Sequence, residues 1–265
     1  MNTTAMLAMM LLSAVPPPAK PPGGIVLEQK TIHAVRSMVG MIEQDETTTK
    51  YFSPTGIRVE TEGSKICAIF RIGAEGRVTR VEVDDRQRTF REENLDARRA
   101  ADEAMRKRLE ERGVPGAGLL LPGVPAAEAA GETEDAPEDE VTVRRIEQPR
   151  VIAGQKCSGV EILRGEEKLF EGWYTVKPAP EWLRRLDLIE APGPRDAEVA
   201  AARQKEKGIE LESTVHLTAG GRYEVRTTRF ETKTVPAAKL AAPAGYRRLP
   251  SPADAAKDDG DKDAR

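Results

Sequence analysis

The stretch from Gly208 to Arg226, GIELESTVHLTAGGRYEVR, is the part of the sequence that decides the fold class. Positions 209, 211, 215 and 217 are Ile, Leu, Val and Leu, whereas Glu, Thr and His occupy the even positions between them. This alternation predicts a strand with one apolar and one polar face. Gly220-Gly221 then predicts a tight turn into a second strand. The apolar face must cover either the core of the protein or a hydrophobic ligand.

Short strand-like segments recur on both sides of the chain's middle. GIVLEQKTI, GIRVETEG, ICAIFRI and RVTRVEVDD precede residue 92, and VTVRRIE, SGVEILRG and EKLFEGWYTVKP follow later. Gly, Pro and Asp separate them, which predicts an antiparallel sheet of hairpins with seven to ten strands. In EGWYTV, Trp173 points to one face and Phe170 and Tyr174 point to the other, as expected of a central strand that is covered on both sides. Trp182 opens the next segment and is placed to pack over this strand.

Three segments predict helices. Residues 93–113, ENLDARRAADEAMRKRLEERG, are rich in helix-forming residues, with Asn94 as N-cap and Gly113 at the end. EWLRRLDLIEA and RDAEVAAARQKEKG predict two shorter helices between residues 181 and 207. The expected fold is therefore α+β: a curved antiparallel sheet with these helices on its concave side. Because their apolar stripes are thin, they should cover the apolar sheet only in part and leave an incompletely filled concavity.

Composition restricts the function classes. Hydrophobic residues make up 39% of the 265 residues, charged residues 32%, and the net charge is −3. This balance lacks the basic footprint of a nucleic-acid-binding protein. The lean apolar content also predicts that some segments lie outside the core.

Three such segments are recognisable. In residues 1–22 the apolar run from Ala5 to Leu12 is too short for a membrane span, which takes roughly 20 residues. It fits a secretory signal cleaved after Ala14 or Ala19, so we expect a periplasmic or secreted protein; a disordered N-terminus is the alternative. Residues 114–140 predict a flexible acidic insertion and residues 251–265 a charged disordered tail. A single domain over residues 23–250 remains.

The sequence offers no constellation typical of catalysis or metal binding. His33 and His216 are its two histidines, and neither has the neighbouring residues that a catalytic base or a zinc site requires. We therefore expect no enzyme, no metal site and no cofactor. Cys67 and Cys157 form a disulfide in an oxidising compartment or act as small buried hydrophobes, and their spacing does not decide between these alternatives.

Two longer motifs resemble a known family. VIAGQKCSGVEILRGEEKLFEGWYTVKPAP (residues 151–180) and ETKTVPAAKLAAPAGYRRL (residues 231–249) resemble modules of the bacterial secreted domain of unknown function 4412 family. YFSPTGIRVE, in the N-terminal half, is similar to the same family, and the resemblance covers residues 25–249. This family is similar in architecture to the periplasmic lipoprotein carriers LolA and LolB, which implies an incomplete barrel whose concave side binds acyl chains.

These observations predict a monomeric carrier or binding protein for a lipid or the acyl group of a lipoprotein. The residues expected to line the ligand site are apolar side chains of the predicted strands: Ile57, Val59, Trp173, Ile209, Leu211, Val215 and Leu217. The alternative function is a cell-envelope scaffold or interaction domain whose core is filled by its own side chains.

Overall fold

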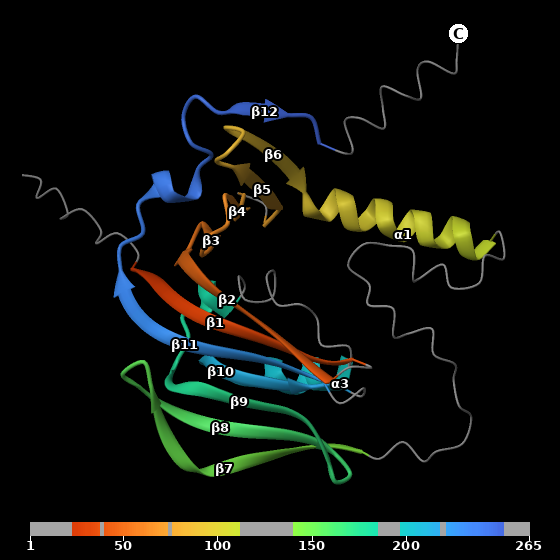
Figure 1. Ribbon diagram of the computed structural model, residues 1–265, viewed down its shortest axis with the longest axis vertical. Coiled ribbons are helices and arrows are strands. Elements are labelled where there is room, and N and C mark those ends of the chain that lie inside the picture. The colour runs from red at the N-terminus through yellow and green to blue at the C-terminus, as the bar shows by residue number, and fades with distance from the viewer. Residues whose placement is uncertain are drawn as a thin grey trace, which may run out of the picture.

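A computed structural model of the chain describes residues 23–37, 40–73, 76–111, 140–184, 197–217 and 221–251 (Figure 1). Within these residues, twelve strands form one open sheet, accompanied by few helices. The strands are β1 Gly24–Ser37, β2 Gly40–Ser53, β3 Gly56–Thr61, β4 Ile66–Ile72, β5 Val78–Asp84, β6 Thr89–Asn94, β7 Val141–Ile152, β8 Gln155–Arg164, β9 Glu167–Pro178, β10 Gly208–His216, β11 Arg222–Lys233 and β12 Arg247–Leu249. The helices are α1 Leu95–Glu111, α3 Ala197–Gln204 and the 3-10 helix η3 Ala237–Leu240.

Two meanders make up the sheet, whose strand order is β12-β6-β5-β4-β3-β2-β1-β11-β10-β9-β8-β7. The first meander runs outward from β1 to β6, and the second returns from β7 to β11. Pairing of β1 with β11 joins them. All strand pairs of the described residues are antiparallel except β12 with β6. The predicted antiparallel sheet is confirmed, but the expected seven to ten strands were too few.

Register irregularities bend the sheet in its second half. They occur between β1 and β11, between β9 and its neighbours β8 and β10, and between β7 and β8. An extra residue in one strand of a pair bends that strand and increases its twist. The long strands in the lower part of Figure 1 are accordingly curved.

The helix α1 begins at Leu95, where the sequence predicts it. Asn94 Oδ1 accepts hydrogen bonds from the backbone N–H groups of Asp96 and Ala97, both at 3.0 Å, which confirms Asn94 as the N-cap. The position of α1 differs from the expectation. It contacts β5 and β6 and extends away from that end of the sheet (Figure 1), instead of lying against a concave face. Its thin apolar stripe is the physical reason, because such a stripe gains little from covering a sheet.

Three apolar clusters form the core. Cluster 1 joins seven strands and is built from Ile25, Leu27, Phe52, Ile57, Ile152, Cys157, Trp173, Leu183 and Leu211. Cluster 2 lies under α3 and is built from Val160, Ile162, Phe170, Tyr174, Val199 and Ala202. Cluster 3 lies under η3 and is built from Cys67, Ile69, Val81, Val83 and Leu240. Leu240, which belongs to the motif at residues 231–249, thus packs against β4 and β5 of the first meander.

Several sequence predictions concern residues outside the described ranges. These are the leader at 1–22, the acidic insertion at 114–140 except Glu140, and the tail after Ser251. In the part of the chain that the structure does describe, no helix has the length and apolarity needed to cross a bilayer. The two cysteines are not bonded to each other, since Cys67 belongs to cluster 3 and Cys157 to cluster 1.

Candidate ligand-binding site

Six of the seven residues expected to line a ligand site lie in or against apolar clusters. Ile57, Trp173 and Leu211 are members of cluster 1, with 0%, 2% and 0% of their surface exposed. Val59 and Ile209 are partly buried against the same cluster, and Val215 packs against cluster 2. The seventh, Leu217, is half-buried at the end of β10, where its N–H donates to the Gly221 carbonyl at 2.9 Å.

Trp173 is the largest fully buried side chain of cluster 1. Its ring packs over Gly159 on the neighbouring strand, where a Cβ atom would lie 3.0 Å from the ring and 2.8 Å from Ile146 Cδ1. The Arg150 guanidinium carbon lies 4.2 Å from the ring centroid, a cation–π arrangement. The indole N–H donates to Glu171 Oε1 at 3.2 Å, so its polar atom is satisfied.

Cluster 2 includes two other aromatic side chains of β9, the strand that carries Trp173. Phe170 and Tyr174 flank Gly172, where a Cβ atom would lie 2.5 Å from the Phe170 ring. Val199 and Ala202 of α3 pack onto this pair and are themselves buried. Trp173 on one face of β9 belongs to cluster 1, and Phe170 and Tyr174 on the other face belong to cluster 2. Both faces of β9 are therefore covered, as its sequence predicts.

A buried polar contact fastens α3 to the sheet. Glu210 Oε2 accepts a hydrogen bond from the Tyr174 hydroxyl at 2.8 Å and another from Arg203 Nη2 at 2.9 Å. The Arg203 guanidinium carbon lies 4.8 Å from the Phe170 ring centroid. Burial, together with the negative charge of Glu210, raises the pKa of Tyr174, so its hydroxyl stays protonated and donates. This contact ties three elements together: α3, β9 and β10.

One connection, from β9 to β10, contributes to the cover of both clusters. Its base is closed by a hydrogen bond of 2.7 Å from the Ala179 N–H to the Lys207 carbonyl. At its first end, a helical turn at residues 181–184 inserts Leu183 into cluster 1, with Trp182 packed beside it. At its second end, α3 contributes Val199 and Ala202 to cluster 2. The predicted packing of Trp182 over the β9 region is therefore confirmed.

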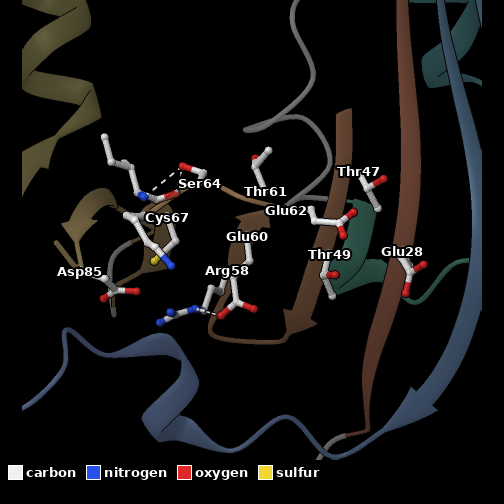
Figure 2. A pocket seen from close by; sticks show the side chains of 12 residues that line it. Glu28, Thr47, Thr49, Arg58, Glu60, Thr61, Glu62, Ser64, Cys67 and Asp85 are labelled. Carbon is white, nitrogen blue, oxygen red and sulfur yellow. Dashed lines mark hydrogen bonds and ion pairs between the residues drawn. The ribbon is translucent and has the colours of Figure 1, made fainter. Parts of the chain in front are cut away.

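A separate polar groove crosses β1 to β4, and Figure 2 shows its side chains. Its volume is about 500 Å³, and it is lined by Glu28, Thr47, Thr49, Arg58, Glu60, Thr61, Glu62, Ser64, Lys65, Ile66, Cys67 and Asp85. The strand register explains the groove, because Glu28, Thr49, Glu60 and Cys67 are direct partners on four adjacent strands. None of the seven predicted residues lines it, and the sequence reasoning missed it because the row forms only when these strands pair.

Two charges of this groove, Arg58 and Glu60, are paired with each other. Arg58 Nε lies 2.6 Å from Glu60 Oε1, and Lys239 Nζ lies 3.3 Å from the same oxygen. Burial would raise the pKa of Glu60, but the hydrogen bond and charge of Arg58 outweigh it and lower the pKa. Burial raises the pKa of the Cys67 thiol, so this thiol stays protonated and unreactive. Within the described ranges, no group of three or more His, Cys, Asp or Glu side chains could hold a metal ion.

Comparisons with known proteins give structural neighbours but no family. No family model matches the chain, and no curated protein matches it either. The solved structure of PNGF-II is 10% identical with a TM-score of 0.36, over 89% of this chain and 33% of that one. The Pseudomonas aeruginosa MucA/MucB complex is 11% identical with a TM-score of 0.37, over 84% and 58%. The chain thus spans less than two thirds of either neighbour.

LolA superfamily structures are also among the neighbours. One, from Nitrosomonas europaea, is 8% identical with a TM-score of 0.26, over 84% of this chain and 91% of that one. The resemblance to the domain of unknown function 4412 family stays a prediction.

Proposed function

We propose that the protein is a non-enzymatic binding protein of the cell envelope that holds a hydrophobic ligand, such as a lipid or the acyl group of a lipoprotein. One observation carries the proposal. The β9–β10 connection helps to cover both apolar clusters, and these clusters gather six side chains that the sequence marks as a ligand face. Among the described residues of this connection, Leu183 is the buried member of cluster 1, and Ala179 and Trp182 are partly buried against it.

An acyl chain would bind by taking the place of Leu183 against the sheet. Each CH₂ group removed from water contributes about 0.8 kcal/mol, so a chain of several carbons offsets the loss of one leucine contact. The surrounding side chains of cluster 1 are apolar, as a lipid site requires. The leader predicted at residues 1–22 supports an envelope location.

Ligand uptake by paired variants tests this function. Native mass spectrometry of protein taken from an envelope fraction should detect a bound lipid, and the purified protein should bind a fluorescent fatty acid. Leu183→Ala should raise the affinity because it vacates space on the ligand face. Leu211→Arg should abolish binding, whereas Val176→Arg, at a position on β9 that is 63% exposed, should leave it unchanged.

A folded Leu183→Ala variant makes the test decisive even where Leu211→Arg does not fold. Unchanged uptake in Leu183→Ala, together with an absence of lipid in the native protein, would overturn the proposal. If Leu211→Arg and Val176→Arg reduced fatty-acid binding equally, the ligand would not bind at cluster 1.

A second candidate function is a scaffold or interaction domain with a self-filled core. The specific observation in its favour is that Ile57 and Leu211 have no exposed surface at all. The groove of about 500 Å³ described above is polar, not apolar. Protein that carries no lipid and takes up no fatty acid, yet folds cooperatively, would favour this function.

A further inference from the structure

The polar groove on β1 to β4 contains carboxylates that the protein itself does not neutralise. Glu28 lies on β1, Glu62 follows β3, and Asp85 follows β5. Among the described residues, no cationic side chain forms an ion pair with any of these three carboxylates. Glu28 accepts a hydrogen bond from the Thr228 hydroxyl and Asp85 accepts one from the Tyr246 hydroxyl, which leaves further acceptor sites on both. The three carboxylates are therefore available to a ligand.

These carboxylates come from alternate strands of the sheet. Because neighbouring strands lie about 4.8 Å apart, positions on every second strand are separated by roughly 10 Å. The strands between them contribute uncharged side chains to the groove, namely Thr47 and Thr49 of β2 and Cys67 of β4. Figure 2 shows Glu28 and Asp85 at opposite sides of the groove. This spacing suits an elongated ligand that carries several separate positive charges.

A buried thiol lines the same groove without a partner. Cys67 is 6% exposed, and its thiol forms no hydrogen bond with any other residue that the structure describes. Its sulfur is a weak acceptor, and the hydroxyl groups of Thr47 and Thr49 beside it can also accept hydrogen bonds. The cations of the lining are Arg58, which is paired with Glu60, and the exposed Lys65. Since the groove offers mainly acceptors, its ligand must donate hydrogen bonds, as a protonated amine does.

We propose that this groove binds a linear polyamine, a chain of methylene groups that carries several protonated amines. The ammonium groups donate hydrogen bonds to the carboxylates of Glu28, Glu62 and Asp85, and the methylene groups lie against Ile66 and Cys67, which also line the groove. The volume of about 500 Å³ suits a small ligand. Binding does not depend on the proposed hydrophobic ligand site, because the groove shares no residue with clusters 1 and 2.

Titration calorimetry with spermidine tests the proposal. At low ionic strength the native protein should bind spermidine saturably, and added salt should weaken the binding. Glu62→Gln should weaken it about fivefold, because the change removes one exposed charge and keeps the shape of the side chain. Glu166→Gln is the matched control and should bind as the native protein does, since Glu166 is exposed in the turn between β8 and β9, outside the groove. Lys65→Gln should strengthen binding about threefold, because it removes a cation from the lining.

Competition with Mg²⁺ separates recognition of amines from a general attraction of cations to an acidic surface. At equal ionic strength Mg²⁺ should displace little spermidine, because it donates no hydrogen bond and needs a compact octahedral set of oxygen ligands. Equal competition by Mg²⁺, equal losses in Glu62→Gln and Glu166→Gln, weaker binding in Lys65→Gln, or the absence of saturable binding would overturn the proposal. Uptake of fatty acid should be unchanged in Glu62→Gln, which separates the polyamine site from the proposed hydrophobic ligand site.

Discussion

Shortening Leu183 to alanine is the most informative perturbation of the cover over cluster 1. The side chain is 3% exposed, and among the described residues of the β9–β10 connection it is the buried one in this cluster. Replacing a buried Leu by Ala costs about 2–5 kcal/mol, depending on how far the site collapses. Leu183 lies in the first helical turn after Pro180, described for residues 181–184, where its own N–H donates to the Pro180 carbonyl at 3.0 Å. Such a turn can follow the shortened side chain, so we expect about 3 kcal/mol.

Urea unfolding followed by tryptophan fluorescence measures this loss, because Trp173 and Trp182 both lie in or against cluster 1. The slope of the free energy against urea should be unchanged, and the melting temperature should fall by roughly 6–12 °C for a domain of this size. Val176→Ala, at a position that is 63% exposed, should change the free energy of unfolding by less than about 0.5 kcal/mol. A loss below about 1 kcal/mol in Leu183→Ala would refute the reasoning, since the leucine would then not be packed against the sheet.

Three further substitutions test separate contacts. Gly159→Ala should destabilise the protein by about 1–3 kcal/mol through its clash with the buried indole, whereas Gly23→Ala, with nothing within 4 Å of the added carbon, should be neutral in the same urea titration. Glu210→Gln should cost about 2 kcal/mol because it leaves a largely buried guanidinium without its carboxylate, and Glu212→Gln, whose ion pair is more exposed, should cost less than half as much in a thermal melt. The pKa of Glu60 is depressed, so its stabilisation is present above its ordinary value of 4.5 and is lost as the pH falls through the folded-state value. Glu60→Gln should therefore be less stable than the native protein at pH 7 and approach it in stability below pH 4.5; a difference that stays constant with pH would contradict this.

Local sequence patterns predicted much of the secondary structure. The alternation in GIELESTVH became β10, Asn94 caps α1, and the aromatic pattern around Trp173 marked a strand covered on both faces. The number of strands was underestimated because some strands show no alternation of apolar and polar residues. Residues 43–49 of β2, EQDETTT, show no apolar alternation. Residues 43–46 are exposed along an edge of the sheet that β3 does not reach, and Thr47 and Thr49 line a polar groove. β12 has only three residues and pairs in parallel, a pairing that no short-range signal announces.

The sequence by itself determined which side chains of each strand are apolar, because successive residues of a strand point to opposite faces whatever the partners of that strand are. Only the tertiary structure decided which of these faces meet. The contact of Gln29 with Thr227 joins residues 198 positions apart, and pairing over such a distance depends on the whole chain rather than on any local period. The same holds for Met41 and Ile42 on β2, which are exposed in a part of the hairpin that β3 and β11 do not flank.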